Sequence, residues 1–429
     1  MSDFKFVHAA DLHLDSPYKG IRDYNEGLGE ALRKAGRRAF ENLIDLCVDE
    51  KVDFLLISGD SFDSGSGSLA AQSYFIKGMK NLEKHDIGVY LICGNHDPLK
   101  SWSSGLQMPD NVTRFESDLP EAVFFEKKGD KKAVIYGHSF LKKEEFRNLA
   151  AEFSHHHPSL FGIGMLHGNL SSHTGHEPYC PFSAEDLRVS GMDYWALGHI
   201  HKREVVLGGA PLAIYPGNIQ GRHFNESGDK GCYLVEVRGK TIADYSFKSL
   251  SPLLFERAEL DLSEINGADG FVDGFRELEQ SYREAHPGKS FLVKAVLRGR
   301  SRLFNSLMDE KELDALIDEV NHGVQFDEDF VFFDRPVNKT GPVIDLDERK
   351  ESSDFVADLL KEFEKLKGDE ELVSNHLESI VDELRGHLSY RHIKEYRPEW
   401  QSPEGQREFL EAALQRCIYG LFEREEEDS

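Results

Sequence analysis

The sequence predicts an α/β fold, and three observations carry that prediction. Short apolar runs alternate with amphipathic stretches over residues 1–250. The apolar residues of these runs stand next to one another without strict alternation, as in strands that are buried on both faces. Polar motifs, most of them containing glycine, follow the runs directly. Repeated strand and helix segments of this kind predict a sheet covered by helices.

Six apolar runs are predicted to be buried strands: residues 4–10, 54–58, 89–93, 133–136, 162–166 and 194–197. Residues 30–50 are predicted to form a helix, because Ala35, Ala39 and Leu43 recur at four-residue steps. Three further runs follow without an intervening helix, at residues 212–215, 231–237 and 241–247. Their succession indicates a closing set of antiparallel strands.

The 429 residues exceed the length at which a single core stops growing, about 250–300 residues, so we expect further units. Ser251-Pro252 is the predicted end of the first domain, residues 1–250. Residues 251–345 are predicted to be a small α+β unit, with strands at 255–260 and 291–297 and helices at 270–285 and 310–322. Residues 346–429 are predicted to be a helical tail with one apolar stripe: Phe355, Leu359, Phe363 and Leu366. The stripe either packs on the chain's own domain or binds a partner.

The composition restricts the classes of partner and compartment. With 51 basic and 77 acidic residues the net charge is −26, which excludes attraction of nucleic acid or membrane by the whole surface. A local basic patch, or a site where bound cations reverse the field, remains open. The five cysteines form no CxxC pair, which favours a reducing compartment. No apolar run approaches the ~20 residues that span a bilayer, so we expect a cytoplasmic protein without a membrane segment.

Five short motifs contain residue types that bind metals: Asp11-Leu-His13, Gly59-Asp60-Ser-Phe-Asp63, Gly94-Asn95-His96-Asp97, His167-Gly168 and Gly198-His199-Ile-His201. Each stands at the end of a predicted strand, where an α/β sheet gathers its ligands. Alternate residues of an extended segment point the same way, so Asp11 and His13 can share one ion, and His199 and His201 can face one site. One such motif alone is more often a turn or a buried polar residue, but five in succession predict a metal site. Carboxylate, imidazole and amide ligands suit Mn, Fe or Zn ions.

This succession of motifs resembles the calcineurin-like metallophosphoesterase superfamily, with D-x-H, G-D-x-x-D, G-N-H-D/E, H and G-H-x-H. The resemblance implies a four-layer αββα metallophosphoesterase sandwich. It also implies two divalent ions, for which we expect Mn²⁺, and it assigns their ligands. The first ion would be held by Asp11, His13, Asp60 and His201, and the second by Asp60, Asn95, His167 and His199.

The resemblance further implies that three residues assist catalysis. His96 would lie over the scissile phosphate, while Asp63 and Asp97 would orient their neighbours. Two ions about 3.5–4 Å apart lower the pKa of a bridging water and hold the attacking and leaving oxygens. The expected reaction is therefore hydrolysis of a phosphate ester by metal-activated water.

Two longer blocks resemble SbcD-like DNA-repair exonucleases, in particular their YhaO-like branch. They are the block from His8 to Pro17, HAADLHLDSP, and the block from Tyr215 to His223, YPGNIQGRH. Protein phosphatases of the superfamily have an Arg after the second motif, where this chain has Ser64-Gly65. The resemblance implies a capping domain over residues 251–345, DNA as substrate, a homodimer, and an SbcC-like coiled-coil ATPase on the tail. Asp15 departs from the usual glycine and either caps a turn or shapes the substrate groove.

Basic residues offer candidate substrate contacts. Arg222 and His223 follow a glycine-containing turn, and Arg298 and Arg300 alternate with apolar residues in a predicted strand that also contains Lys294. Further basic clusters stand at residues 33–38 and 127–132. The alternative interpretation of the basic clusters and of the strand is an ordinary solvated surface.

Three functions remain in contention. The leading hypothesis is a DNA exo- or endonuclease that acts in DNA repair. The alternatives are a small-molecule phosphodiesterase or nucleotidase, which a narrow pocket would favour, and a catalytically idle scaffold, which an absence of bound metal would favour.

Overall fold

The computed structural model describes residues 3–18, 25–63, 68–103, 105–117, 120–171, 179–327, 329–343, 350, 355–367, 405, 410, 413, 414 and 417. The chain divides into two compact units. The first contains Met1–Arg257, Tyr282–Val293 and Val324–Phe332, and the second contains Ala258–Ser281, Lys294–Gly323 and Phe333–Ser429. The predicted domain limits at residues 250 and 345 stay predictions.

The first unit contains a six-stranded sheet with the strand order β12-β11-β1-β2-β3-β4. Its strands are β1 (Phe4–Ala9), β2 (Phe54–Ser58), β3 (Gly88–Ile92), β4 (Val112–Arg114), β11 (Gly231–Arg238) and β12 (Thr241–Ser249). Strands β1 to β4 run parallel, whereas β11 and β12 are antiparallel to their neighbours. The predicted closing antiparallel strands at residues 231–237 and 241–247 are thus present.

A second six-stranded sheet has the order β5-β6-β7-β8-β10-β9. Its strands are β5 (Glu121–Lys127), β6 (Asp130–Gly137), β7 (Phe161–His167), β8 (Tyr194–Gly198), β9 (Glu204–Leu207) and β10 (Leu212–Tyr215). The prediction that residues 212–215 join the closing antiparallel set is wrong. The short strand β9 turns the chain back, so that β10 runs parallel to β8 in this second sheet.

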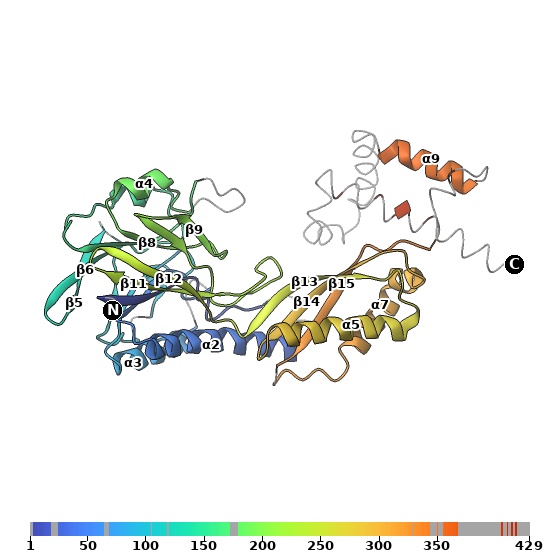
Figure 1. Ribbon diagram of the computed structural model, residues 1–429, viewed down its shortest axis with the longest axis horizontal. Helices are drawn as coiled ribbons and strands as arrows, with labels where there is room; N and C mark the ends of the chain where they lie inside the picture. The colour runs from blue at the N-terminus through green and yellow to red at the C-terminus, as the bar shows by residue number, and fades with distance from the viewer. Residues whose placement is uncertain are drawn as a thin grey trace. The chain divides into compact units, whose positions relative to one another are not determined.

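Four layers result, which confirms the predicted αββα sandwich (Figure 1). Aromatic residues such as Phe4, Phe6 and Phe161 fill the core between the two sheets. Helices α2 (Glu26–Asp49) and α3 (Leu69–Glu83) cover the outer face of the first sheet. The outer face of the second sheet is covered by η2 (Leu149–Glu152) and α4 (Ala184–Val189), and η1 (Leu99–Ser101) follows β3.

Local sequence explains where the covering helices begin. The side chain of Asn25 accepts a hydrogen bond from the Leu28 amide at the start of α2, and that of Ser68 accepts one from the Ala71 amide at the start of α3. Such N-caps satisfy amide groups that have no partner within the helix. The predicted helix at residues 30–50 is therefore present and begins four residues earlier.

Residues 253–338 form a three-stranded sheet, β13-β14-β15, together with helices. The elements are β13 (Leu253–Asp261), α5 (Gly267–Ala285), β14 (Ser290–Arg298), α6 (Phe304–Met308), α7 (Glu310–Val320) and β15 (Val331–Asn338). Within the second unit, Phe275 of α5 packs edge to face against Phe333 of β15.

The helix α9 (Phe355–Lys367) is the described part of the predicted tail. Its Val356 and Leu360 are buried against Leu359 and Leu414, whereas Phe355 is 68% exposed. Because Leu414 belongs to the same tail, both alternatives for the stripe stay predictions. Most of residues 346–429, to which the predicted ATPase binding belongs, lies outside the described residues, as does the side chain of Leu366. Among the described helices, none combines the length and the apolar character of a transmembrane segment.

Candidate metal centre

Loops at the carboxyl ends of five strands bring the predicted ligands together in the first unit. Asp11 follows β1, Asp60 follows β2, Asn95 follows β3, His167 ends β7, and His199 follows β8. Three of these strands belong to the first sheet and two to the second. The carboxyl ends of both sheets therefore supply the site.

Four of the candidate ligands have strained backbone conformations. Asp11, His13, Asp60 and His199 have φ angles of 52°, 44°, 51° and 100°. Such angles are unfavourable for residues with a side chain and cost about 1–3 kcal/mol each. Hydrogen bonds between the loops hold them, including Asp11 N to Gly59 O and His13 N to Asp60 O, both at 3.1 Å. Strain concentrated at one place is typical of functional sites.

The glycines of the motifs allow the loops to approach one another. A Cβ atom at Gly94 would lie 2.3 Å from Asp60 Oδ1, and one at Gly59 would lie 2.4 Å from His167 Nδ1. At Gly198 it would lie 1.9 Å from the Ser58 carbonyl oxygen. These distances are too short for any side chain, so each glycine is required by the position of a neighbouring loop.

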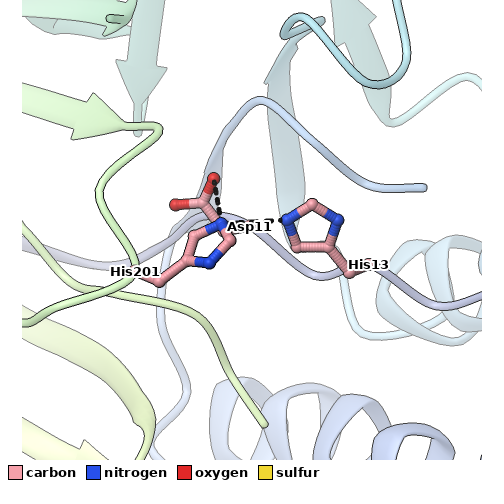
Figure 2. A group of neighbouring side chains, drawn as sticks. All are labelled: Asp11, His13 and His201. Atoms are coloured by element: carbon pink, nitrogen blue, oxygen red, sulfur yellow. Dashed lines mark hydrogen bonds and ion pairs between the residues drawn. The ribbon is translucent and has the colours of Figure 1, made fainter. Parts of the chain in front are cut away.

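Asp11, His13 and His201 form a first cluster (Figure 2). The Nε2 atoms of His13 and His201 are 3.1 Å apart, and His201 Nε2 is 3.9 Å from Asp11 Oδ1. Carboxylates lie behind both imidazoles. Asp63 Oδ1 is 3.1 Å from His13 Nδ1, and Glu226 Oε1 is 2.7 Å from His201 Nδ1.

The donor set of this first cluster fits a metal ion. A carboxylate only accepts, so the hydrogen of each neutral imidazole belongs on Nδ1, and each Nε2 presents a lone pair. Burial and the charge of Arg222 lower the pKa of His13 to about 4, so His13 is neutral near pH 7. Two lone pairs that face each other beside the Asp11 carboxylate repel unless a cation lies between them.

Asp60, His167 and His199 form a second cluster, which Asn95 completes. His167 Nε2 is 3.2 Å from Asp60 Oδ2 and 3.0 Å from Asn95 Oδ1, while His199 Nδ1 is 3.2 Å from the same Asn95 oxygen. The other ring nitrogen of His167 donates to the Ser58 carbonyl oxygen at 2.9 Å. A neutral His167 thus directs its lone pair at two oxygen acceptors.

A proton stabilises this second cluster when no metal is bound. Burial alone would lower the pKa of His167, but the Asp60 carboxylate outweighs burial and raises the pKa to about 9. A divalent cation would take the place of that proton. The second cluster therefore also fits a metal ion.

The two clusters are connected by hydrogen bonds. The backbone amide of His199 donates to Asp11 Oδ1 at 3.1 Å, which joins a residue of the second cluster to one of the first. Asp60 directs one oxygen at His167, and its other oxygen accepts from the His96 amide at 2.9 Å. That Asp60 bridges two ions stays a prediction.

Asp97 and Asp15 both accept hydrogen bonds from backbone amides. Asp97 is fully buried and accepts from the amides of Asp60, Ser61 and Gly94 at 2.8–3.1 Å. Asp97 therefore holds the loops after β2 and β3 together. Asp15 accepts from the Asp63 amide at 2.6 Å, which favours the turn-capping interpretation of that residue.

His96 lies between Asp63 and a cleft. Its Nδ1 is 2.9 Å from the Asp63 carbonyl oxygen, so Nδ1 carries a hydrogen and Nε2 remains available for a bound ester. The Asp63 carboxylate is close to the imidazoles of both His13 and His96. These positions suit the predicted roles of His96 and Asp63, which stay predictions.

Sequence reasoning missed Glu226. Its carboxylate accepts from His201 Nδ1 at 2.7 Å, from Asn218 Nδ2 at 2.8 Å and from the Arg222 amide at 2.8 Å. Arg222 connects this carboxylate, 3.4 Å from Nη2, to Asp63, 2.9 Å from Nη1. An acidic residue four positions after an arginine in a glycine-containing turn was the available signal. Arg222 thus links the two carboxylates behind the imidazoles of the first cluster.

The predicted substrate contacts separate into two groups. Arg222 and His223 border the cleft, and Arg222 is already engaged by carboxylates. Arg298 and Arg300 belong to the second unit, where Arg298 pairs with Glu259 at 2.7 Å. Contact of any of the four with substrate stays a prediction. In the other basic clusters, ion pairs such as Lys127–Asp53, Lys34–Asp327 and Arg38–Glu41 favour the interpretation as solvated surface.

Comparison with known proteins identifies the family. Residues 4–203 match the calcineurin-like phosphoesterase family. Over 300 residues the chain is 42% identical to a Bacillus subtilis protein named uncharacterized metallophosphoesterase YhaO, covering 70% of this chain and 72% of that protein. The chain belongs to the calcineurin-like phosphoesterases.

This phosphoesterase also matches two archaeal proteins named DNA double-strand break repair protein Mre11. The one from Methanocaldococcus jannaschii is 28% identical over 298 residues, which cover 65% of this chain and 71% of that protein. The one from Sulfurisphaera tokodaii is 25% identical over 329 residues, covering 72% and 77%.

The phosphoesterase has a cleft of about 790 Å³ at the candidate metal centre. Asp60, Asn95 and His199 border it, together with His96. Another part of its wall carries basic residues, among them Lys230. Oxygen and nitrogen ligands beside a basic wall suit a substrate with negatively charged phosphate groups.

Proposed function

We propose that this phosphoesterase hydrolyses phosphodiester bonds in DNA with the help of two divalent ions, for which we expect Mn²⁺. The observation that carries the proposal is the convergence of two groups of acceptor atoms, around His13 and around His167, beside one cleft. The similarity to relatives named DNA double-strand break repair proteins supports DNA as the substrate.

Different residues of the chain would have different roles in such a reaction. Ions bound at the two clusters would supply an activated water and polarise the phosphate oxygens. Asp63 and Glu226 fix the imidazoles of His13 and His201, so that Nε2 of each ring points into the site. His96 lines the cleft, and its Nδ1 hydrogen is held by the Asp63 carbonyl oxygen. When the ring carries a second hydrogen on Nε2, His96 would give that proton to the leaving oxygen and return to its neutral form.

The size of the cleft supports a second candidate function. A cleft of about 790 Å³ falls within the range of sites for small molecules, about 300–1,000 Å³. A small-molecule phosphodiesterase or nucleotidase is therefore the alternative.

A nuclease assay separates the two functions. The full chain with Mn²⁺ is incubated with labelled linear DNA and, separately, with bis(p-nitrophenyl) phosphate. Release of nucleotides that is lost in His96→Asn supports the nuclease. His156→Asn is the matched control, because His156 is exposed and does not line the cleft. Hydrolysis of the small ester without release of nucleotides would refute the proposal.

The partners are part of the same proposal. We infer that the chain acts as a homodimer with an SbcC-like coiled-coil ATPase. The net charge of −26 supports this, because the isolated chain then binds DNA weakly and gains from a partner that contacts DNA. Light scattering of the chain alone, and co-elution with a coiled-coil ATPase, test the two associations. A monomer that does not bind such an ATPase would contradict them.

A further inference from the structure

Lys230 is a buried cation on the wall of the cleft. Its side chain is only 8% exposed, and lysine is almost never buried unless it is paired. Its ammonium group contacts the His201 carbonyl oxygen at 3.4 Å. Among the described residues, no carboxylate lies at ion-pair distance from the Lys230 ammonium group. Glu226, the acidic residue that lines the same cleft, is already held by His201 and Asn218. An ammonium group has three donors, so Lys230 has spare capacity for an anion.

Lys202 adds a second positive charge to this wall. It directly follows His201, lines the same cleft and is exposed. Within the described ranges, it too forms no ion pair. Lys127 and Lys294, by contrast, pair with the carboxylates of Asp53 and Asp334. In a chain of net charge −26, two lysines that remain available at one cleft indicate an anionic ligand.

Both lysines are anchored to the candidate metal centre through His201. Lys202 is its neighbour in the chain, and Lys230 contacts its carbonyl oxygen. The Nε2 atom of the same His201 belongs to the first cluster. A phosphate group bound at the clusters would therefore share the cleft with both lysines. Asn225 and Ser227 line the same wall and offer neutral polar groups.

We propose that Lys202 and Lys230 form a subsite for the phosphate that adjoins the scissile phosphate, so that the cleft selects ligands with two phosphates separated by a nucleoside. This inference rests on the proposed function and deepens it, because a strand of nucleic acid carries such a neighbouring phosphate and a phosphate monoester does not. Charge-assisted hydrogen bonds from the two ammonium groups would hold it.

Calorimetric titration of the Mn²⁺-loaded full chain tests the subsite. The probes are thymidine 3′,5′-bisphosphate and thymidine 5′-monophosphate. Hydrogen bonds to a charged group make the bisphosphate bind about tenfold to a hundredfold more tightly. Lys202→Met and Lys230→Met reduce this ratio and leave the affinity for the monophosphate nearly unchanged. Lys80→Met, on the exposed side of α3 and outside the cleft, is the matched control and keeps the ratio.

Four outcomes decide the matter. Equal binding of the two probes by the unmodified chain overturns the proposal, as does an equal loss for both probes in Lys202→Met. Because Lys230 is buried, thermal unfolding shows whether Lys230→Met folds, and Lys202→Met carries the test if it does not. DNA cleavage is scored separately. DNA cleavage without tighter binding of the bisphosphate refutes the subsite alone. Tighter binding of the bisphosphate without DNA cleavage refutes the proposed nuclease and supports the subsite.

Discussion

Replacing Glu226 by glutamine removes the carboxylate behind His201. Glu226 accepts three hydrogen bonds at 2.7–2.8 Å, from His201 Nδ1, from Asn218 Nδ2 and from the Arg222 amide. A glutamine has one oxygen and one NH₂ group, so at least one of these donors would face another donor. His201 would then lose the contact that keeps hydrogen on Nδ1 and a lone pair on Nε2.

The size of the effect follows from these contacts. Loss of a group that orients a metal-binding imidazole costs about 10- to 100-fold in metal affinity, or about 1.4–2.7 kcal/mol. A buried donor left without a partner lowers the free energy of unfolding by a further 1–3 kcal/mol, roughly. We expect weaker binding at the first cluster, whereas the second cluster, whose ligands do not contact Glu226, keeps its affinity.

A calorimetric titration with Mn²⁺ measures both steps of binding. Glu264→Gln removes an exposed carboxylate in the second unit and is the control. Unchanged affinity of Glu226→Gln for both ions would refute the reasoning, because His201 would then be oriented without its carboxylate.

Three further predictions concern the second cluster and the backbone around it. Metal binding at the second cluster displaces the proton of His167, whose pKa is about 9, so the metal affinity falls by up to about tenfold for each pH unit below that value. Calorimetric titration with Mn²⁺ at several pH values measures this, and a constant affinity would contradict it. Without metal, the raised pKa of His167 also stabilises the fold: the contribution is fully present below the unfolded pKa of 6.5 and is lost as the pH rises through about 9. Thermal unfolding of the metal-free chain measures this, and an unfolding temperature that does not change between these pH values would contradict it. Gly94→Ala places a methyl group 2.3 Å from Asp60 Oδ1, so we expect weaker metal binding and a lower unfolding temperature. Gly208→Ala is the control, because the space around Gly208 is open. Equal metal affinity and equal unfolding temperature of the two variants would contradict the close approach of Gly94 to Asp60.

The strand ends of the site were predictable because they depend on local pattern. Residues 54–58 form β2 as predicted, since a short apolar run between polar residues is sufficient to indicate a buried strand. Once such strands lie parallel in a sheet, the residues after them, such as Asp60 and Asn95, meet at one edge. The order of motifs was thus enough to predict a common site.

Other features depend on contacts between distant segments. Glu226 contacts His201 although 25 positions separate the two residues, and the local pattern around Arg222 does not specify that partner. The basic row of β14 was visible in the sequence, but the pairing of Arg298 with Glu259 depends on the neighbouring strand β13. The direction of β10 likewise follows from the edge strand β9 and not from the composition of residues 212–215.

Anomalous diffraction from crystals of the Mn²⁺-loaded chain tests the metal centre most directly. We predict two peaks about 3.5–4 Å apart, one in contact with Nε2 of His13 and His201 and the other with Nε2 of His167 and the side-chain oxygen of Asn95. A single peak, or peaks remote from these atoms, would contradict the dinuclear site.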